Sequence, residues 1–224
     1  VKATDFVNAP FYEHQIATLN LGAQFVFGQK YLSYPNKKEN LDSNKYPNLS
    51  LNYRKTFGAK NSDLNSDAFT GRVTQEINLG NYGKLSYNIR GGIFLEKKEI
   101  AFMDYFQPNG NQFTFPLDIS YINSFGLLNY YQIYSNERYA EMHLQHDFRG
   151  AILGKIPGLN LLNFHLVAGG KALFTAERKP YSEYSLGLNN IGWGKWRFLR
   201  IDYVRSNFGG IQRSDWLFGL SMFN

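Results

Sequence analysis

The chain has four histidines, whose side chains could ligate a metal ion or act as a catalytic base: His14, His143, His146 and His165. His143 and His146 have a ligand-like spacing. Residues three apart on a β-strand point to opposite faces, however, so this pair cannot chelate one ion from a strand. Glu141 and His143 could share a site only if His165, on the next strand, were in register with them. We therefore expect no metal site and no cofactor.

The sequence also lacks the patterns of the common hydrolases. No Gly-x-Ser-x-Gly motif occurs, and no histidine stands in an expected loop beside clustered carboxylates. There is no cysteine, which excludes a disulfide framework and a thiolate metal site. We expect that the protein is not an enzyme.

The charge of the chain is basic but scattered. There are 24 Lys and Arg against 18 Asp and Glu, a net charge of +6, and the basic residues gather only in pairs such as Lys37-Lys38 and Lys97-Lys98. Proteins that bind nucleic acid concentrate such charge on one face or in one run. We therefore expect no nucleic-acid partner, and interpret the charge as a basic rim near anionic lipid headgroups.

Composition indicates what kind of elements must position these residues. The 224 residues are 17% aromatic, yet the mean hydropathy is only −0.39. No apolar run reaches the roughly 18 residues that a transmembrane helix needs. Many aromatic residues with a low mean hydropathy are typical of transmembrane β-barrels, in which lipid-facing residues alternate with polar ones along each strand.

Alternation of apolar and polar residues predicts the strands themselves. In 17–27, Leu19 and Leu21 share one face, while Thr18 and Asn20 share the other. Similar patterns predict strands at 48–57, 69–79, 84–95, 138–148, 162–174, 183–190, 196–206 and 215–224. Charged residues facing lipid would be costly. Seven ionisable residues of these segments fall on the polar faces: Arg54, Arg72, Glu76, Arg90, Glu141, Arg200 and Asp202.

Turns and loops order these strands. The glycine-rich segments 80–83 and 192–195 predict tight hairpin turns, which fall on the periplasmic side if the last strand ends there. Segment 29–46 then becomes a rather long periplasmic turn, unless an undetected strand pair lies there or within 96–136. The connection 96–136 falls outside, and its length and aromatic residues predict an extracellular loop or one folded into the lumen.

The C-terminal strand bears on how such a barrel would be inserted. A terminal amphipathic strand with a final aromatic residue is what the outer-membrane assembly machinery reads, and here Phe223 is penultimate. An ordinary last strand without a signalling role is the alternative. The chain begins at Val1 without Met or a signal peptide, which indicates a processed or partial chain. The expected signal strand comprises Trp216, Phe218, Gly219, Leu220, Met222 and Phe223.

Several short motifs resemble one family of proteins. They are the run Tyr-Tyr-Gln-Ile-Tyr-Ser-Asn-Glu-Arg-Tyr at 130–139, His-Asp-Phe-Arg-Gly at 146–150, and Asn160 preceded by Lys-Ile-Pro at 155–157. Their order and spacing, over 65–224, resemble outer-membrane proteins of unknown function that carry a carboxypeptidase-regulatory-like domain ahead of a barrel. The strands 184–188 and 198–203 also resemble the end of the BamA and TamA superfamily of assembly and translocation barrels.

The alternation along the chain predicts an all-β fold for residues 1–224, and the resemblance implies the same fold for 65–224. We expect a transmembrane antiparallel β-barrel, or the C-terminal half, with about eight to ten strands, of a larger, sixteen-stranded one. Residues 96–136 would occupy the place of the loop that plugs the superfamily's lumen, although no Val-Arg-Gly-Phe-like motif occurs there. The inward charges expected to anchor this loop through charge-assisted hydrogen bonds are Arg138, Glu141, Arg200 and Asp202, the alternative being ordinary solvated lumen charges.

The function implied is non-enzymatic and BamA/TamA-like, in outer-membrane biogenesis, secretion or transport as part of a larger complex. The expected location is the outer membrane of a Gram-negative bacterium. The expected partners are outer-membrane lipid and lipopolysaccharide, the assembly machinery, and other outer-membrane or periplasmic subunits. The alternatives are a plugged pore or surface scaffold without insertase activity, an outer-membrane hydrolase, and a soluble β-rich module.

Overall fold

The computed structural model describes residues 15–41, 45–58, 65–97, 100, 104–111 and 122–220. The strands in these ranges are β1 (Ile16–Val26), β2 (Lys30–Ser33), β3 (Lys38–Leu41), β4 (Asn48–Gly58), β5 (Ser66–Asn78), β6 (Lys84–Lys97), β7 (Arg138–Asp147), β8 (His165–Thr175), β9 (Tyr181–Trp193), β10 (Trp196–Phe208) and β11 (Ile211–Leu220). Short 3₁₀ turns connect some of them: η2 (Gly80–Tyr82), η4 (Leu153–Lys155) and η5 (Leu159–Leu162). No helix in the described ranges is long and apolar enough to cross a membrane.

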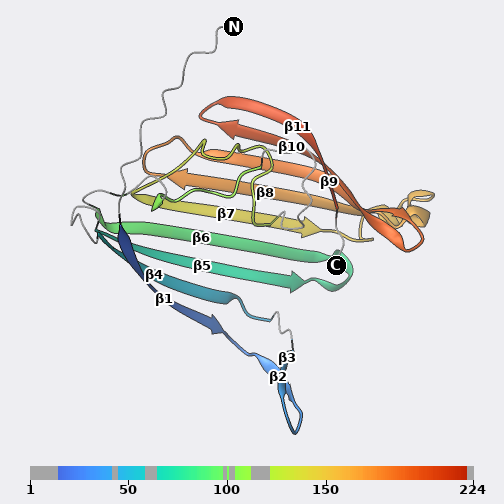
Figure 1. The fold of residues 1–224 in the computed structure, drawn as a ribbon. Helices are drawn as coiled ribbons and strands as arrows, with labels where there is room; N and C mark the ends of the chain where they lie inside the picture. The colour runs from blue at the N-terminus through green and yellow to red at the C-terminus, as the bar shows by residue number, and fades with distance from the viewer. Residues whose placement is uncertain are drawn as a thin grey trace.

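Within the described residues, nine strands form one antiparallel sheet in the order β1-β4-β5-β6-β7-β8-β9-β10-β11. Except for the step from β1 to β4, each strand pairs with the next one along the chain, so the sheet is a meander of hairpins (Figure 1). Strands β2 and β3 form a separate hairpin between β1 and β4, which projects from one end of the sheet (Figure 1). The strand pair allowed for in 29–46 therefore exists.

The alternation in the sequence correctly predicts the all-β class and the strands of the sheet. Each of the nine predicted segments overlaps one of its strands. The main differences are at strand ends: β9 is longer than the predicted 183–190, and 162–164 belong to the connection before β8. Residues 221–224 of the predicted last strand lie outside the described residues.

The sheet formed by the described residues is not closed, so a complete barrel within this chain, one of the two expected arrangements, is not shown. A barrel forms only when its first and last strands pair with each other. Among the described residues, β1 pairs only with β4 and β11 pairs only with β10, so each has one unpaired edge. The shown architecture is a large open antiparallel sheet.

The two faces of the sheet have the reverse of the usual polarity of a soluble protein. Large apolar side chains point outward and are exposed; Leu21 is 57% exposed on β1 and Leu186 is 56% exposed on β9. The opposite face buries charged and amide side chains, among them Asn88, Glu141, Glu183, Arg200 and Asp202. This division matches the apolar and polar faces that alternation predicts.

The register of the sheet can be tested with cysteine pairs, because the chain has no cysteine of its own. Met142 on β7 lies directly opposite Ala172 on β8, and Ala140 lies opposite Phe174. Cα atoms of opposed residues are about 4.5–5.5 Å apart, within reach of a disulfide, whereas diagonal neighbours are about 7–8 Å apart. We expect Met142→Cys with Ala172→Cys to cross-link on mild oxidation and Ala140→Cys with Ala172→Cys to fail, as measured by peptide mass spectrometry. Equal yields from both pairs would contradict this register.

Candidate functional site

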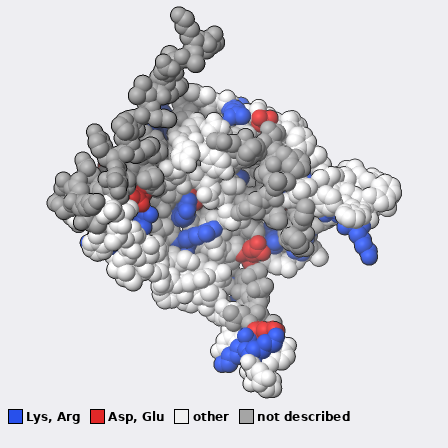
Figure 2. Space-filling model, viewed as in Figure 1, with Lys and Arg blue, Asp and Glu red and all other residues white. Residues whose placement is uncertain are grey.

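The candidate site is the buried polar face of the sheet together with the segment that covers it. The described parts of the long connection between β6 and β7, residues 104–111 and 122–137, lie against this face. Figure 1 shows the segment crossing in front of the middle strands. Figure 2 views the same side and shows basic side chains gathered near its middle. The contacts below explain how these parts of the chain are held there.

Glu183 on β9 makes the most concentrated contact with this segment. Its carboxylate accepts hydrogen bonds from the backbone N–H groups of Gly126 at 2.7 Å and Leu127 at 2.8 Å. It also accepts one from the Tyr181 hydroxyl at 2.6 Å. The side chain is only 1% exposed. Hydrogen bonds to an ionised acceptor are among the stronger ones in proteins, so Glu183 fixes the backbone position of the segment.

Lys171, on the neighbouring strand, also contacts both Glu183 and the segment. We call Glu183 and Lys171 together the Glu183 clamp. Residues Lys171 of β8 and Glu183 of β9 are directly opposite each other in the register. The Lys171 Nζ lies 3.9 Å from the Glu183 Oε2 and donates a hydrogen bond to the backbone carbonyl of Ser124 at 2.7 Å. A buried charge needs a partner of opposite sign or good hydrogen bonds, and the two side chains supply both to each other and to the segment.

Gly126 allows the segment to come this close to the sheet. A Cβ atom added at this position would lie 2.7 Å from the Leu217 Cδ1 on β11, which is shorter than real contacts of that kind. A glycine therefore suits the point where the backbone meets both Glu183 and the last strand. Leu127, next to it, is buried in a small cluster with Val204 and Leu217.

A second polar anchor lies nearer to β5 and β6. The side-chain oxygen of Asn123 accepts hydrogen bonds from the Arg72 Nη2 at 2.7 Å and from the Asn88 Nδ2 at 2.8 Å. Arg72 Nε in turn donates to the Asn88 Oδ1 at 2.9 Å. These three side chains therefore form a closed network between two strands and the segment.

Apolar contacts fill the space between these anchors. Phe125 is fully buried, with its ring centroid 4.6 Å from that of His143 and 5.5 Å from that of Tyr181. Phe106 stacks on Tyr139 at the beginning of β7, with ring centroids 3.3 Å apart. The fully or nearly fully buried apolar residues of the molecule thus include several from this connection, so it is part of the core.

The two described arms of the connection also bond to each other. The Phe125 N–H donates to the Asn109 carbonyl at 2.8 Å, and the Asn111 N–H donates to the Leu128 carbonyl at 2.7 Å. Phe106 and Ser135 exchange backbone hydrogen bonds as an isolated antiparallel bridge. The covering segment is therefore internally ordered as well as attached to the sheet.

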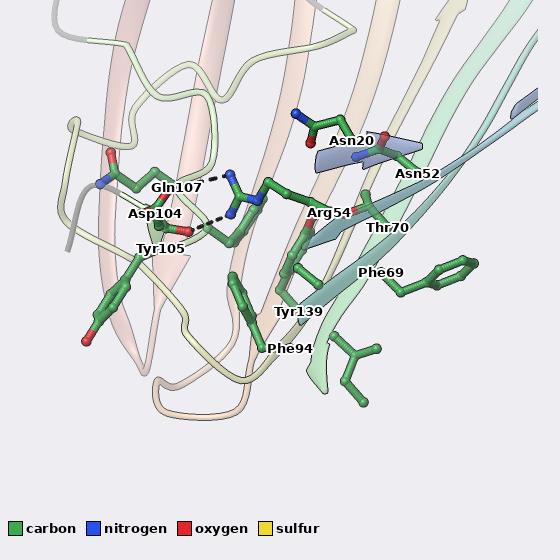
Figure 3. Close-up of a pocket in the computed structure, with 13 residues that line it drawn as sticks. Asn20, Asn52, Arg54, Phe69, Thr70, Phe94, Asp104, Tyr105, Gln107 and Tyr139 are labelled. Carbon is green, nitrogen blue, oxygen red and sulfur yellow. Dashed lines mark hydrogen bonds and ion pairs between the residues drawn. The ribbon is translucent and has the colours of Figure 1, made fainter. Parts of the chain in front are cut away.

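A polar cavity remains at one side of the segment, between it and strands β1, β4 and β5. It has a volume of about 300 Å³, and Asn20, Asn52, Arg54, Thr70 and Asp104 contribute polar groups to its lining. Figure 3 shows Arg54 reaching across toward Asp104, while Phe69 points away from the cavity. Arg54 Nη2 donates to the Asp104 carbonyl at 3.0 Å, and its Nη1 lies 3.7 Å from the Asp104 carboxylate.

A second cavity, of about 280 Å³, lies near the other end of β4 and β5 and beside the start of β6. Arg72, Glu76, Asn88 and Asn123 are among the residues that line it. Both cavities are lined by amide, hydroxyl and charged groups from strands whose other face is apolar. They are suited to water and small polar solutes.

The predicted loop-anchoring charges lie on the inner face, except for Arg138, which is exposed at the start of β7. Glu141 pairs with Arg90 of β6 at 2.8 Å. Arg200 and Asp202 pair with each other through two contacts of 2.6 and 2.9 Å, and Arg200 also donates to Gln145. A loop-anchoring role for these four residues stays a prediction.

Sequence reasoning missed the residues that contact the segment most directly: Glu183, Lys171, Arg72 and Asn88. One signal was available, because Lys171 and Glu183 occupy inward positions of strands that are neighbours in the sequence. Their register, which brings the two charges together, could not be read from the sequence.

The histidines are distributed as the period of the strands requires. His143 is buried on the inner face opposite Lys171, whereas His165 lies opposite Asn189. His146 contacts the Tyr82 carbonyl at 2.9 Å. No three His, Asp or Glu side chains of the described chain come together as metal ligands, and His14 lies outside it.

The described part of the predicted signal strand presents an apolar outer face. Trp216 and Phe218 are exposed on β11, Gly219 between Phe218 and Leu220 is buried, and Leu220 ends the strand. Met222 and Phe223 lie outside the described residues. The signalling role itself stays a prediction.

The Glu183 clamp generates a test of how the connection is held. Glu183→Ala would leave two backbone N–H groups and the Tyr181 hydroxyl without their acceptor and Lys171 without its opposite charge, at a cost of about 1–3 kcal/mol. Segment 122–134 contains Phe125, Leu127 and Tyr130, which chymotrypsin can cleave after. We expect chymotrypsin to cleave this segment faster in folded Glu183→Ala than in the wild type, both in detergent. The cleavage rate of Glu183→Gln should lie between those of the wild type and Glu183→Ala. The matched control is Glu39→Ala, which removes an exposed partner of Lys37 on the separate β2–β3 hairpin. Cleavage of Glu183→Ala at the wild-type rate would refute the clamp.

Comparison with known proteins identifies a family for this chain. No curated protein and no solved structure is significantly similar to this chain. Residues 2–188 match the C-terminal domain of a family of unknown function, DUF5686. This match begins and ends earlier in the chain than the range 65–224 that contains the sequence motifs described above. This span covers most of the 224 residues. The chain therefore belongs to the family of unknown function DUF5686 and contains its C-terminal domain.

Proposed function

We propose that this chain is part of the wall of a β-barrel in a bacterial outer membrane, with the connection between β6 and β7 held inside. In this proposal the protein is not an enzyme. It acts in outer-membrane biogenesis, secretion or transport within a larger complex, as the resemblance to the BamA and TamA superfamily implies.

The reversed polarity of the sheet carries this proposal. Soluble proteins rarely expose large continuous apolar patches, and they rarely bury ionised residues. Here Leu21, Ile89, Leu144, Leu186 and Phe218, on strands from one edge of the sheet to the other, have exposed outward side chains. The inward face buries Glu141, Glu183, Arg200 and Asp202. Lipid on the outer face and a polar interior are the surroundings that satisfy both faces at once.

The two unpaired edges indicate that, in the membrane, this sheet would need further strand pairing to form a closed barrel. An open edge exposes backbone N–H and C=O groups that have no hydrogen-bond partner in hydrocarbon, so a membrane sheet must be closed. Strands β1 and β11 would therefore pair with each other, or with further strands of a longer chain or complex. Sixteen strands, as in the resembling superfamily, would be consistent with the second arrangement.

The covering segment favours a filled interior over a wide pore. Its anchors extend from Arg54 on β4 to Glu183 on β9, so it spans most of the inner face. A plugged pore or a surface scaffold without insertase activity is the main alternative role. Co-purification with the outer-membrane assembly machinery or with periplasmic subunits would support biogenesis, whereas a steady open-channel current would support the pore.

The proposed membrane location predicts different effects for two neighbouring residues on β1. Arg or Lys on the lipid face near the bilayer centre costs about 2–4 kcal/mol, while the polar face tolerates charge. We expect Leu21→Arg to abolish assembly and Asn20→Arg to permit it, as measured by the amount of protein that remains in outer membranes after a carbonate wash. Release of the wild type by carbonate, or equal loss of both variants, would contradict the proposal.

The filled interior predicts a change in ion conductance. Wild-type protein in planar bilayers should give little or no current, because the segment occupies the inner face. Glu183→Ala should give larger or more frequent current steps, and Glu39→Ala, on the separate β2–β3 hairpin, should resemble the wild type. Identical currents from wild type and Glu183→Ala would argue against a segment that plugs the interior.

A further inference from the structure

One end of the sheet carries an exposed patch that the proposed wall does not explain. It consists of the connection between β7 and β8, which contains η4 and η5, and the tight turn between β9 and β10. In Figure 1 both lie at the right-hand end of the sheet, beyond the ends of the other strands. We call these two segments, residues 149–163 and 193–197, the end patch.

The two segments of the end patch are tied together. The Asn190 Nδ2 donates to the Asn163 carbonyl at 2.7 Å, and Arg197 donates to the Leu162 carbonyl. Asn163 itself adopts the left-handed conformation, which ends η5 and turns the chain into β8. The patch therefore has a defined surface.

That surface is strongly apolar for an exposed one. Leu161 is 78% exposed at the tip of the connection, and Trp193 and Trp196 at the turn are 89% and 75% exposed. Further exposed apolar residues of the same connection are Ile152, Ile156, Leu159 and Leu162. An isolated exposed leucine needs no explanation, but a group of this size marks a surface that meets an apolar partner.

The charges of the end patch are all of one sign. Arg149, Lys155, Lys195 and Arg197 are its ionisable residues, and the sequence has no Asp or Glu from 148 to 164 or from 189 to 199. Lys155 and Lys195 are exposed beside the apolar side chains. On the side that Figure 2 shows, this lobe of the molecule carries blue and white atoms and no red ones.

We propose that the end patch inserts into the headgroup region of an anionic phospholipid leaflet. Exposed leucines and isoleucines with flanking tryptophans and basic residues are the composition of segments that lie at a bilayer interface. Lysine is depleted at protein–protein interfaces, so two lysines beside the apolar tips favour lipid over a protein partner. This inference rests on the proposed function, and adds that the wall is held at one end by anionic lipid of the adjoining leaflet.

Tryptophan fluorescence in vesicles with brominated phospholipids tests the proposal. Trp193→Phe, Trp196→Phe and Trp216→Phe remove the natural tryptophans, and Leu161→Trp then places a single reporter on the end patch. A second protein keeps only Trp216, which reports on the outer face of the sheet. Each protein is reconstituted with phosphatidylcholine or phosphatidylglycerol that carries bromine near the headgroup end of the acyl chains.

We expect the Leu161→Trp reporter to be quenched, and more strongly by brominated phosphatidylglycerol than by brominated phosphatidylcholine. Adding Lys155→Gln and Lys195→Gln should reduce the preference for the anionic lipid, by up to about fivefold for each lysine. Quenching by phosphatidylcholine should stay the same. The same two lysine substitutions are also made in the second protein, where unchanged quenching of Trp216 would show that the sheet still assembles.

The other outcomes separate this inference from the proposed wall. If Trp216 is quenched and the Leu161→Trp reporter is not, the end patch does not meet lipid and the inference is wrong, while the wall stands. Equal quenching by both lipids would overturn the anionic preference, and the proposal with it. If neither reporter is quenched, the proposed membrane wall fails as well.

Discussion

The hydrogen bonds from the backbone of Gly126 and Leu127 to the buried carboxylate of Glu183 are the contact on which the arrangement of the polar face depends. A carboxylate removed from water must be stabilised by hydrogen bonds or by an opposite charge. Here the covering segment supplies the N–H donors and Lys171 supplies the charge. The requirement is mutual, because a buried backbone N–H also needs an acceptor. The segment and the sheet therefore stabilise each other, and removing either would leave unsatisfied polar groups.

The same requirement extends across the sheet from one charged residue to the next. Arg90 lies opposite Glu141, and Lys171 lies opposite Glu183, so opposite charges meet in the register of neighbouring strands. Asp202 instead pairs with Arg200, two residues away on the same face of β10. Each of these pairs satisfies charge locally, which allows the polar face to be covered closely while the outer face stays apolar.

Much of this architecture follows from the two-residue period of a strand. Leu21 and Asn20, or Met142 and His143, are adjacent in the sequence and lie on opposite faces, and alternation alone assigns them correctly. The contacts of the covering segment do not follow from any period. Asn123 contacts Arg72, and Gly126 contacts Glu183, because the connection between β6 and β7 folds back over the sheet. These contacts join residues that are far apart in the sequence. The sequence also could not predict whether the sheet closes into a barrel, because alternation assigns the two faces of each strand but does not say which strands pair at the edges of the sheet.

In the proposed arrangement, lipid covers the apolar face of the sheet and the segment between β6 and β7 covers the opposite, polar face. A nitroxide scan along β4 in reconstituted bilayers tests it most directly, because the chain has no native cysteine and Asn52 lines the cavity of about 300 Å³. Accessibility to oxygen, which partitions into lipid, should peak at Leu49, Leu51 and Tyr53. Accessibility to a water-soluble nickel complex should peak at Ser50 and Asn52, with the opposite phase. Equal or greater access of the nickel complex to the apolar positions would contradict a membrane-embedded sheet.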